Sequence, residues 1–374
     1  MIKEQRMQKQ EIIAITGNAG KTTTKEMLAC IIQKKWKIVK TFSNGNSPYF
    51  IKKCVKELDE SYHAAVLEYG MQKSGDIAEL CQILQPNIGI ITNVGLSHIG
   101  SFKDGIKAIA AGKTELIKNM LSAGKLYLNA DDENSKLLDT SEYAGTIIYI
   151  GIKNSSAYHA HDIFSSENGI KFKMNLDNAV CEFQIPILGR HNVYNALFAI
   201  AVSHQLGFTP FEIKTALASF KAVYLRLNLY KYENYKLIDD THNASPESTI
   251  AAIDVLCEIG KANNILILAA SHGQGNCDEG YIKSGKYIAS QKISFLYTME
   301  NKYAGPEIKQ LSAAAIEAGF PPDRVMHFKN ISDFYLHFKK QLTPGATCLV
   351  KGAGTYFVIR LLRLFPLKPI KCFA

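Results

Sequence analysis

The residues with the clearest chemical potential form a glycine-rich stretch, I-T-G-N-A-G-K-T-T-T-K-E, at positions 15–26. Glycines permit positive φ and close approach of the backbone, and amides at a helix N-terminus attract phosphate oxygens. We therefore expect Lys21 to reach the β- and γ-phosphates of a nucleotide and the Thr22 hydroxyl to bind Mg²⁺. The residues expected to hold the nucleotide are Gly17, Asn18, Ala19, Gly20, Lys21, Thr22 and Thr23.

The spacing of this loop, G-x-x-G-K-T, is shorter than the common phosphate-binding form G-x-x-x-x-G-K-[ST]. The alternative interpretation is an ordinary strand-to-helix turn in which a threonine caps the helix. Residues 11–16 are apolar and β-branched like a buried strand, and a helical pattern follows from Thr22 to about Gln33. Two glycines and a lysine at such a junction favour the phosphate-binding interpretation.

Two further side chains follow predicted strands. Glu68 lies at the end of A-A-V-L-E-Y-G, and His98 lies just past N-I-G-I-I-T-N-V-G. Ligands in open parallel sheets gather at the carboxyl ends of the strands, so both side chains are expected near Lys21. Glutamate is a hard oxygen ligand for Mg²⁺, whereas histidine is a less usual one. Each of them alone is more often a structural residue.

Strand-like runs alternate along the chain with helical patterns, among them 132–139 and 246–259, which predicts an α/β protein with a parallel sheet. Residues 152–187 differ, because short alternating runs around turn signals predict a small antiparallel insert. The αβ alternation restarts after about residue 222. We expect a P-loop parallel-sheet ATPase domain over 1–222 and a smaller Rossmann-like domain over 223–374.

The composition is that of a soluble globular enzyme, with 47% hydrophobic and 21% charged residues among 374. The eight cysteines are scattered without a C-x-x-C pair, which indicates reduced cytosolic thiols and argues against a zinc site. The charged N-terminus lacks the apolar segment of a secretory signal, and no apolar run is long enough to span a membrane. The net charge of +9 is dispersed, so we expect a cytoplasmic protein without stable membrane insertion or nucleic-acid partners.

Several ordered motifs resemble those of one family, the Mur ligases, which are ATP-dependent enzymes that build peptide bonds in peptidoglycan precursors of the cell wall. The resemblance is carried by T-G-N-A-G-K-T-T-T-K-E at 16–26, LEYGMQKSGDIAEL at 67–80, PNIGIITNVGLSHIGSF at 86–102, AAGKTELI at 110–117, LNADD at 128–132, LGRHNVYNALFAIAVSHQLG at 188–207 and IDDTHNASPEST at 238–249. The short glycine loop matches the family's own form. The last motif points to the branch that adds D-alanyl-D-alanine to a UDP-linked tripeptide.

The resemblance implies a role for each matching residue. Lys21 and Thr22 would bind phosphates and Mg²⁺, and Glu68 and His98 would bind a second Mg²⁺. The remaining nucleotide contacts implied are Asn192 with the adenine, Arg226 with the phosphates and Asp240 with the ribose. The substrate contacts implied are Asn44, Asn46, Asn243 and Ser245. Read from the residues alone, Asn192 is a helix N-cap and Asp240 belongs to a strand-end turn.

The chain also departs from the family's pattern. The resemblance begins at residue 11, where the family normally has a preceding domain that holds the UDP-sugar. The hairpin region 41–50 is shortened, and Leu225 stands where a glycine usually precedes the arginine. SHGQGNCDEG at 271–280 and KGAGTYFVIR at 351–360 replace two motifs near the amino-acid site. We therefore expect intact ATP chemistry and altered recognition of both substrates.

The implied reaction uses ATP and Mg²⁺ to activate a small-molecule carboxylate as an acyl-phosphate, which the amine of an amino acid or dipeptide then attacks. Catalysis would rest on Lys21, Glu68, His98 and Arg226. Two alternatives stay open: a non-catalytic ATP-binding relative and a P-loop kinase or GTPase. N-K-Y-A at 301–304 lacks the aspartate of a guanine-reading N-K-x-D motif, which disfavours the GTPase.

Overall fold

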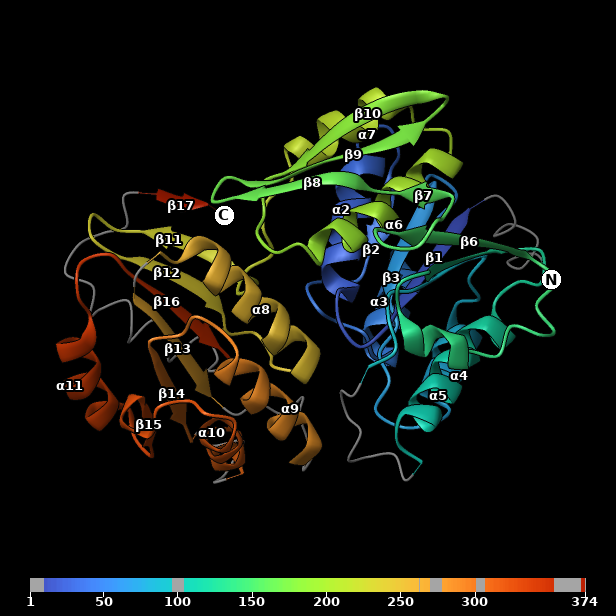
Figure 1. Ribbon diagram of the computed structural model, residues 1–374. Coiled ribbons are helices and arrows are strands. Elements are labelled where there is room, and N and C mark those ends of the chain that lie inside the picture. Colours follow the sequence, from blue (N-terminus) through green and yellow to red (C-terminus); the bar gives the residue numbers. More distant parts are fainter. Residues whose placement is uncertain are drawn as a thin grey trace.

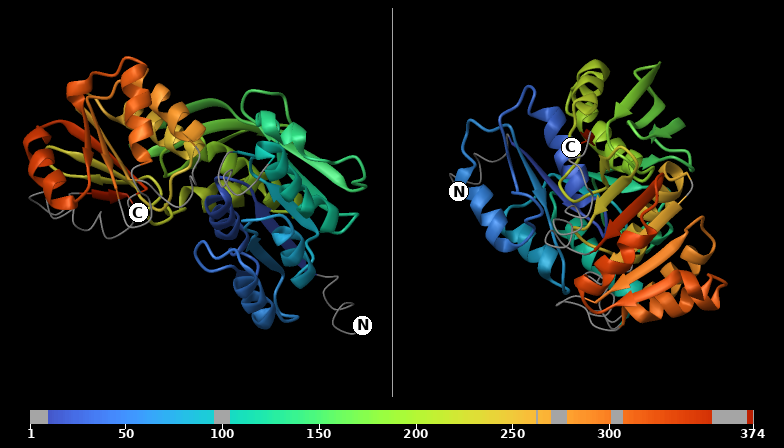
Figure 2. Two further views of the ribbon diagram at one scale, coloured as in Figure 1. Left: turned by 90° about the horizontal axis from the view of Figure 1, so that it is seen from below. Right: turned by 90° about the vertical axis from the view of Figure 1, so that its left-hand side faces the viewer.

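A computed structural model describes residues 10–95, 104–261, 263–269, 278–300, 307–352 and 371–373. Figures 1 and 2 show two large sheets flanked by helices, with the smaller green sheet lying over the first of them. The predicted site residue His98 lies outside the described residues, as do most of the 271–280 segment and residues 353–360. Across the described ranges, no helix combines the length and apolar character needed to cross a membrane.

The first sheet consists of seven parallel strands in the order β2-β3-β1-β4-β5-β6-β7. The strands are β1 (Glu11–Thr16), β2 (Ile38–Lys40), β3 (Ala64–Glu68), β4 (Ile88–Ile91), β5 (Lys125–Asn129), β6 (Thr146–Gly151) and β7 (Tyr158–His159). The central strands read as almost continuous apolar runs because both faces of the sheet are covered. The carboxyl ends of β1, β3 and β4 therefore meet at one edge, next to the glycine loop.

Helices cover both faces of this sheet. The helices are α2 (Lys21–Ile32), α3 (Pro48–Glu57), α4 (Asp76–Ile83), α5 (Gly105–Asn119), α6 (Asn192–Gln205) and α7 (Pro210–Ala218), with a 3-10 turn, η3 (Glu133–Leu137). One apolar core contains residues of α2, α6 and α7, and the other contains residues of α3, α4 and α5. The first core continues into a three-stranded antiparallel sheet formed by β8 (His161–Ser166), β9 (Gly169–Leu176) and β10 (Ala179–Ile185).

The second large sheet follows after α7, in the order β15-β14-β13-β16-β12-β11-β17. Its strands are β11 (Asn228–Lys231), β12 (Lys236–Asp240), β13 (Asn263–Ala269), β14 (Phe295–Met299), β15 (Val325–Phe328), β16 (Ala346–Lys351) and β17 (Lys371–Phe373). Its helices are α8 (Pro246–Ile259), α9 (Asp278–Ala289), α10 (Ile308–Glu317) and α11 (Ile331–Gln341), with the 3-10 turn η4 (Pro322–Arg324). The strands from β15 to β12 are parallel, β11 runs antiparallel to β12, and the edge strand β17 runs antiparallel to β11.

The structure confirms the α/β class, and it corrects two local predictions. The region 41–50 is not a hairpin: a turn precedes Pro48, which starts α3 as proline at the first helical position commonly does. Residues 132–139 form only the short 3-10 turn η3 rather than a helix. The predicted insert over 152–187 supplies the antiparallel sheet from His161 onward, while the short strand β7 within it joins the large parallel sheet.

Candidate active site

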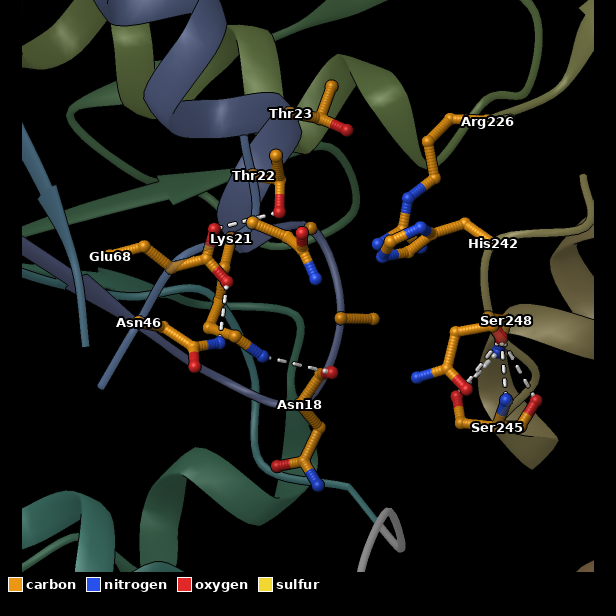
Figure 3. A pocket seen from close by; sticks show the side chains of 14 residues that line it. Asn18, Lys21, Thr22, Thr23, Asn46, Glu68, Arg226, His242, Ser245 and Ser248 are labelled. Atoms are coloured by element: carbon orange, nitrogen blue, oxygen red, sulfur yellow. Dashed lines mark hydrogen bonds between the residues drawn. The ribbon is translucent and has the colours of Figure 1, made fainter. Parts of the chain in front are cut away.

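A polar pocket lies between the glycine loop of the first sheet and segments next to strands of the second sheet (Figure 3), and it encloses about 730 Å³ including the solvent space at its mouth. The glycine loop and the strand ends of the first sheet form one wall, and segments on either side of β11 and β12 form the other. The lining residues are Asn18, Ala19, Gly20, Lys21, Thr22, Thr23, Asn44, Asn46, Glu68, Arg226, His242, Asn243, Ser245 and Ser248.

The glycine loop depends on the absence of a Cβ at two positions. Gly17 has φ +141°, and an added Cβ would lie 1.9 Å from the hydroxyl oxygen of Thr92. Gly20 has φ +84°, and an added Cβ would lie 2.4 Å from the amide oxygen of Asn195. Both the backbone conformation and the close neighbours therefore require glycine, which places the start of α2 directly against β4 and α6.

The end of β4 holds the loop in place. The Asn93 side-chain oxygen accepts hydrogen bonds from the backbone N–H groups of Asn18 and Ala19, at 3.0 Å each. Thr92 donates its hydroxyl to the Ala19 carbonyl at 2.6 Å. This differs from the expectation that successive loop amides face a phosphate, because these two already have a protein acceptor. The residues at the start of α2, from Gly20 to Thr23, line the pocket.

Lys21 begins helix α2 at the pocket wall, and its ammonium donates to the Gly17 carbonyl at 2.7 Å. Burial lowers the pKa of Lys21; the negative charge of Glu68 opposes this shift, and the positive charge of Arg226 adds to it. A half-buried cation that donates to the carbonyls of Gly17 (2.7 Å) and Asn18 (3.5 Å) is poised to bind an anion, because an anionic ligand would offset its desolvation.

Glu68 joins three elements at the pocket floor, and Figure 3 shows its carboxylate between two partners. One oxygen accepts the Thr22 hydroxyl at 2.8 Å, and the other accepts the Asn46 side-chain amide at 3.1 Å. The glutamate is 2% exposed. Carboxylate and hydroxyl oxygens this close are the hard ligands that Mg²⁺ prefers. The described residues contain no cluster of three or more histidine, cysteine, aspartate or glutamate side chains that could hold a metal.

A buried lysine positions the turn that supplies Asn44 and Asn46. The Lys25 side chain is fully buried in α2, and its ammonium donates to the carbonyls of Thr41 (2.8 Å) and Ser43. The Thr41 hydroxyl accepts the Glu68 backbone N–H at 3.1 Å. These bonds tie the turn to both α2 and β3, which explains why a segment without regular structure is placed at the pocket.

Arg226 and His242 lie on the opposite side of the pocket (Figure 3). Among the described residues, the Arg226 guanidinium has no ion-pair partner, although it is close enough to Glu68 and Asp240 for both charges to act on its pKa. Burial and the charge of Arg226 lower the pKa of His242 to about 4, so its imidazole is neutral at pH 7. The pocket therefore presents two cations, Lys21 and Arg226, from opposite walls.

Ser245 and Asn243 begin helix α8 on the same wall. Ser245 accepts the backbone N–H of Ser248, and the Ser248 hydroxyl accepts the Ser245 N–H at 2.8 Å. This capping box, followed by proline at the first helical position, explains why the helix begins here. The local bonds leave the helix N-terminus directed at the pocket, where its partial positive charge favours an anion.

Among the predicted residues that the structure describes, three do not line the pocket. Gly17 starts the loop, and Thr92 occupies the space that a Cβ at this position would need. Asn192 is buried at the start of α6, where it donates to the Leu188 carbonyl and accepts from Asn195 at 2.7 Å. Asp240 pairs with the buried Lys351 at 2.5 Å. In this structure both polar groups of Asn192 and the charge of Asp240 are therefore used within the protein.

Sequence reasoning missed several residues of the site. His242 and Ser248 line the pocket beside two predicted residues, and both lie within the motif IDDTHNASPEST at 238–249, which was the signal that could have found them. Lys113, within A-A-G-K-T-E-L-I, does not line the pocket but is a buried lysine of α5 whose pKa burial lowers to about 7, with a further contribution from the charge of Lys21. A charged residue inside an apolar helical pattern was the signal that marked it.

The first parallel sheet carries a short glycine loop after its strand β1, and this loop forms one wall of a cationic pocket. These features define a P-loop α/β protein. Residues 15–203 match the Mur ligase middle domain. The UDP-N-acetylmuramoyl-tripeptide–D-alanyl-D-alanine ligase of Bacillus subtilis is 31% identical over 91% of this chain and 73% of its own length. The corresponding Buchnera aphidicola enzyme is 32% identical over 91% and 72%. The chain belongs to the Mur ligase family.

Solved structures share the fold. The similarity to MurF from Acinetobacter baumannii has a TM-score of 0.85, at 24% identity over 97% of this chain and 78% of that one. MurF from Thermotoga maritima, solved in complex with ADP, has a TM-score of 0.81 at 22% identity over 96% and 81%. A pseudomurein peptide ligase from Methanothermus fervidus has a TM-score of 0.74 at 20% identity over 96% and 81%.

Proposed function

We propose that this protein is an ATP-dependent, ADP-forming ligase that joins the amine of an amino acid or dipeptide to a carboxylate. The observation that carries the proposal is the placement of Lys21 and Arg226 on opposite walls of one pocket, above the paired oxygens of Thr22 and Glu68. The named relatives, which are UDP-N-acetylmuramoyl-tripeptide–D-alanyl-D-alanine ligases, support the same reaction class.

The phosphates of ATP would lie against the start of α2. There the amides of Gly20 to Thr23 precede the first hydrogen bond within the helix, in which the Thr24 N–H donates to the Gly20 carbonyl. Lys21 would contact the β- and γ-phosphates, and Arg226 would reach them from the other wall. Thr22 would bind the Mg²⁺ that accompanies the phosphates, and Glu68 and His98 would bind a second Mg²⁺, as the family implies. Asn192 and Asp240 would contact the adenine and the ribose.

The chemistry balances in two steps. A substrate carboxylate oxygen attacks the γ-phosphorus, the bond to the bridging oxygen of ADP breaks, and an acyl-phosphate forms. The amine nitrogen then attacks the acyl carbon, and collapse of the tetrahedral adduct expels inorganic phosphate with loss of a proton from nitrogen. The carboxylate and the γ-phosphate repel each other, and the cations Lys21 and Arg226 offset that repulsion.

We further propose that residues 1–222 and 223–374 are two domains and that each wall of the pocket binds one substrate. Asn44 and Asn46 lie beside Glu68 and would contact the carboxylate acceptor, a peptidoglycan precursor or a related peptide. Asn243 and Ser245, at the start of α8, would contact the amine substrate, together with His242 and Ser248. Closure of the two walls over ATP would exclude water from the acyl-phosphate.

Trapping with hydroxylamine tests the proposal most directly. The purified protein is incubated with MgATP and a panel of carboxylates and amines, including UDP-linked muramoyl peptides and D-alanyl-D-alanine, and acyl-hydroxamate and ADP are measured. We expect hydroxamate with at least one carboxylate, and its loss in Lys21→Ala. Near-normal release of ADP by Lys21→Ala would contradict the role of the loop, and the absence of hydroxamate across the panel would contradict ligase activity.

A further inference from the structure

The backbone around Arg226 has an unusual conformation. Leu225 has φ +62° and Leu227 has φ +51°, so two leucines in the left-handed region flank the arginine. The Arg226 N–H donates to the Val223 carbonyl at 3.1 Å and closes a turn in which Leu225 is the third residue. Positive φ at the third position of a turn is normally supplied by glycine or asparagine, because a Cβ crowds the carbonyl oxygen.

Tertiary contacts keep this strained segment in place. Leu225 and Leu227 are both buried, and Leu227 packs in an apolar cluster with Leu188 and Leu229. The His242 N–H donates to the Leu225 carbonyl at 3.3 Å. Strained residues persist only where the surroundings hold them, and they gather at ligand sites. Here the anchors come both from the segment just before α6, through Leu188, and from the strands of the second sheet.

The Arg226 side chain itself has few restraints. Its guanidinium forms no ion pair with any residue that the structure describes, so its position in the pocket comes from the backbone that carries it. A flexible arginine would lose rotational freedom when it bound a phosphate, and holding its backbone in advance reduces that loss.

We propose that Leu225 and Leu227 are positioning residues that direct Arg226 at the phosphates through a backbone strained on both sides. The inference rests on the proposed function, because it assigns a phosphate ligand to Arg226. The inference explains why a leucine stands where the resembled motif has glycine. Glycine could adopt the left-handed conformation among many others, whereas burial of the leucine side chain holds the backbone in that one conformation.

Two substitutions at one position separate strain from packing. Leu225→Gly and Leu225→Ala both remove most of the buried side chain, but only glycine accepts the positive φ without strain. We expect the Leu225→Gly variant to have about a fivefold larger ratio of folded to unfolded protein than the Leu225→Ala variant in denaturant titrations. We also expect the Leu225→Gly variant to bind MgATP at least about threefold more weakly than the Leu225→Ala variant does, because the glycine backbone is free to move Arg226. A purely structural role would make the more stable variant the better binder.

A double-mutant cycle connects the effect to Arg226. In an Arg226→Ala background, titration calorimetry with MgATP should show equal affinities for the proteins that also carry Leu225→Gly or Leu225→Ala. Asn178→Gly provides the matched control, since Asn178 has φ +62° in the β9–β10 turn, away from the pocket. It should leave MgATP affinity unchanged. A threefold difference that survives removal of Arg226, or no difference in the wild-type background, would overturn the inference.

The binding measurements also separate this inference from the proposed ligase activity. If the protein binds MgATP and the cycle behaves as expected but no hydroxamate forms, the ligase proposal fails and the positioning role stands. If hydroxamate forms and the cycle shows no coupling, the positioning role fails alone. A wild-type protein that does not bind MgATP would overturn both.

Discussion

The Thr22 hydroxyl donates a hydrogen bond to the Glu68 carboxylate across 2.8 Å, although the two residues are 46 positions apart in the chain. Thr22 belongs to the first turn of α2, and Glu68 ends β3, which pairs with β1 in parallel register. The pairing of these strands brings the two oxygens together at one sheet edge. The same edge carries the phosphate-binding loop, so a cation held there would lie beside the phosphates.

Glu68→Gln should separate the charge of this site from its shape. The glutamine amide can still accept the Thr22 hydroxyl, but it removes the negative charge that a divalent cation requires. We expect kcat to fall by more than about 100-fold at fixed MgATP. The melting temperature should change by only a few degrees. Glu79→Gln, on the exposed side of α4, is the control for loss of one carboxylate and should retain activity. Activity close to wild type in Glu68→Gln would exclude a metal-binding role.

Gly17→Ala tests how strictly the loop requires glycine. The new Cβ would lie 1.9 Å from Thr92 Oγ1 at φ +141°, so both a clash and backbone strain are introduced. We expect the free energy of unfolding to fall by more than about 2 kcal/mol and MgATP binding to be lost. Gly75→Ala is a matched control, because it has φ +91° and open space around its Cβ position. Gly75→Ala should lower the free energy of unfolding by only about 1 kcal/mol. Equal losses in chemical denaturation would show that the Thr92 contact is unimportant.

The stability of the protein should depend on pH through His242. Burial and Arg226 lower the pKa of this imidazole to about 4 in the folded protein, below its unfolded value of about 6.5. Neutral His242 therefore makes its full contribution to the free energy of unfolding above pH 6.5. That free energy falls as the pH drops from 6.5 toward 4, by at most about 1.4 kcal/mol per pH unit from this group. Urea titrations at pH 7, 6 and 5 should show a smaller decline for His242→Gln than for the wild type. Parallel curves for the two proteins would contradict the lowered pKa.

Glu167→Gln should weaken a connection between the small antiparallel sheet and the second large sheet. Glu167, in the β8–β9 turn, forms ion pairs with Lys231 (2.5 Å) on β11 and with Lys236 on β12. Burial raises the pKa of Glu167, but the hydrogen bonds from the two lysines outweigh it, so the pKa lies below its usual value. The stabilisation is therefore present at neutral pH and is lost as the pH falls through that lowered pKa.

Because the three side chains are partly exposed, we expect a modest effect of Glu167→Gln, at most about 1 kcal/mol, or about 2–4 °C in melting temperature. The difference from wild type should shrink in 1 M salt, where surface charges are screened. Glu182→Gln, an exposed residue of β10, is the control and should leave the melting temperature unchanged. A loss that is independent of salt would indicate packing rather than charge.

Much of the architecture follows from local sequence. The strand 11–16 and the helix 246–259 have the bounds predicted from their residue patterns, because such patterns act within one element of the chain. The glycine loop is equally local: its glycines, lysine and threonine lie within six consecutive residues. The family motifs add an order along the chain, and residues of the motifs at 16–26, 67–80 and 238–249 line the pocket.

Other features depend on contacts between distant segments. Asn93 takes up two loop amides, Lys351 pairs with Asp240, and the turn before Pro48 is placed by the buried Lys25. No local pattern specifies which carbonyl or carboxylate a buried side chain will meet, since that choice depends on how the sheets and helices pack. The left-handed conformation of Leu225 is the clearest case, because leucine by itself disfavours it. The sequence alone determined the phosphate loop and the order of strands and helices, whereas packing between the two sheets decided which charges face the pocket.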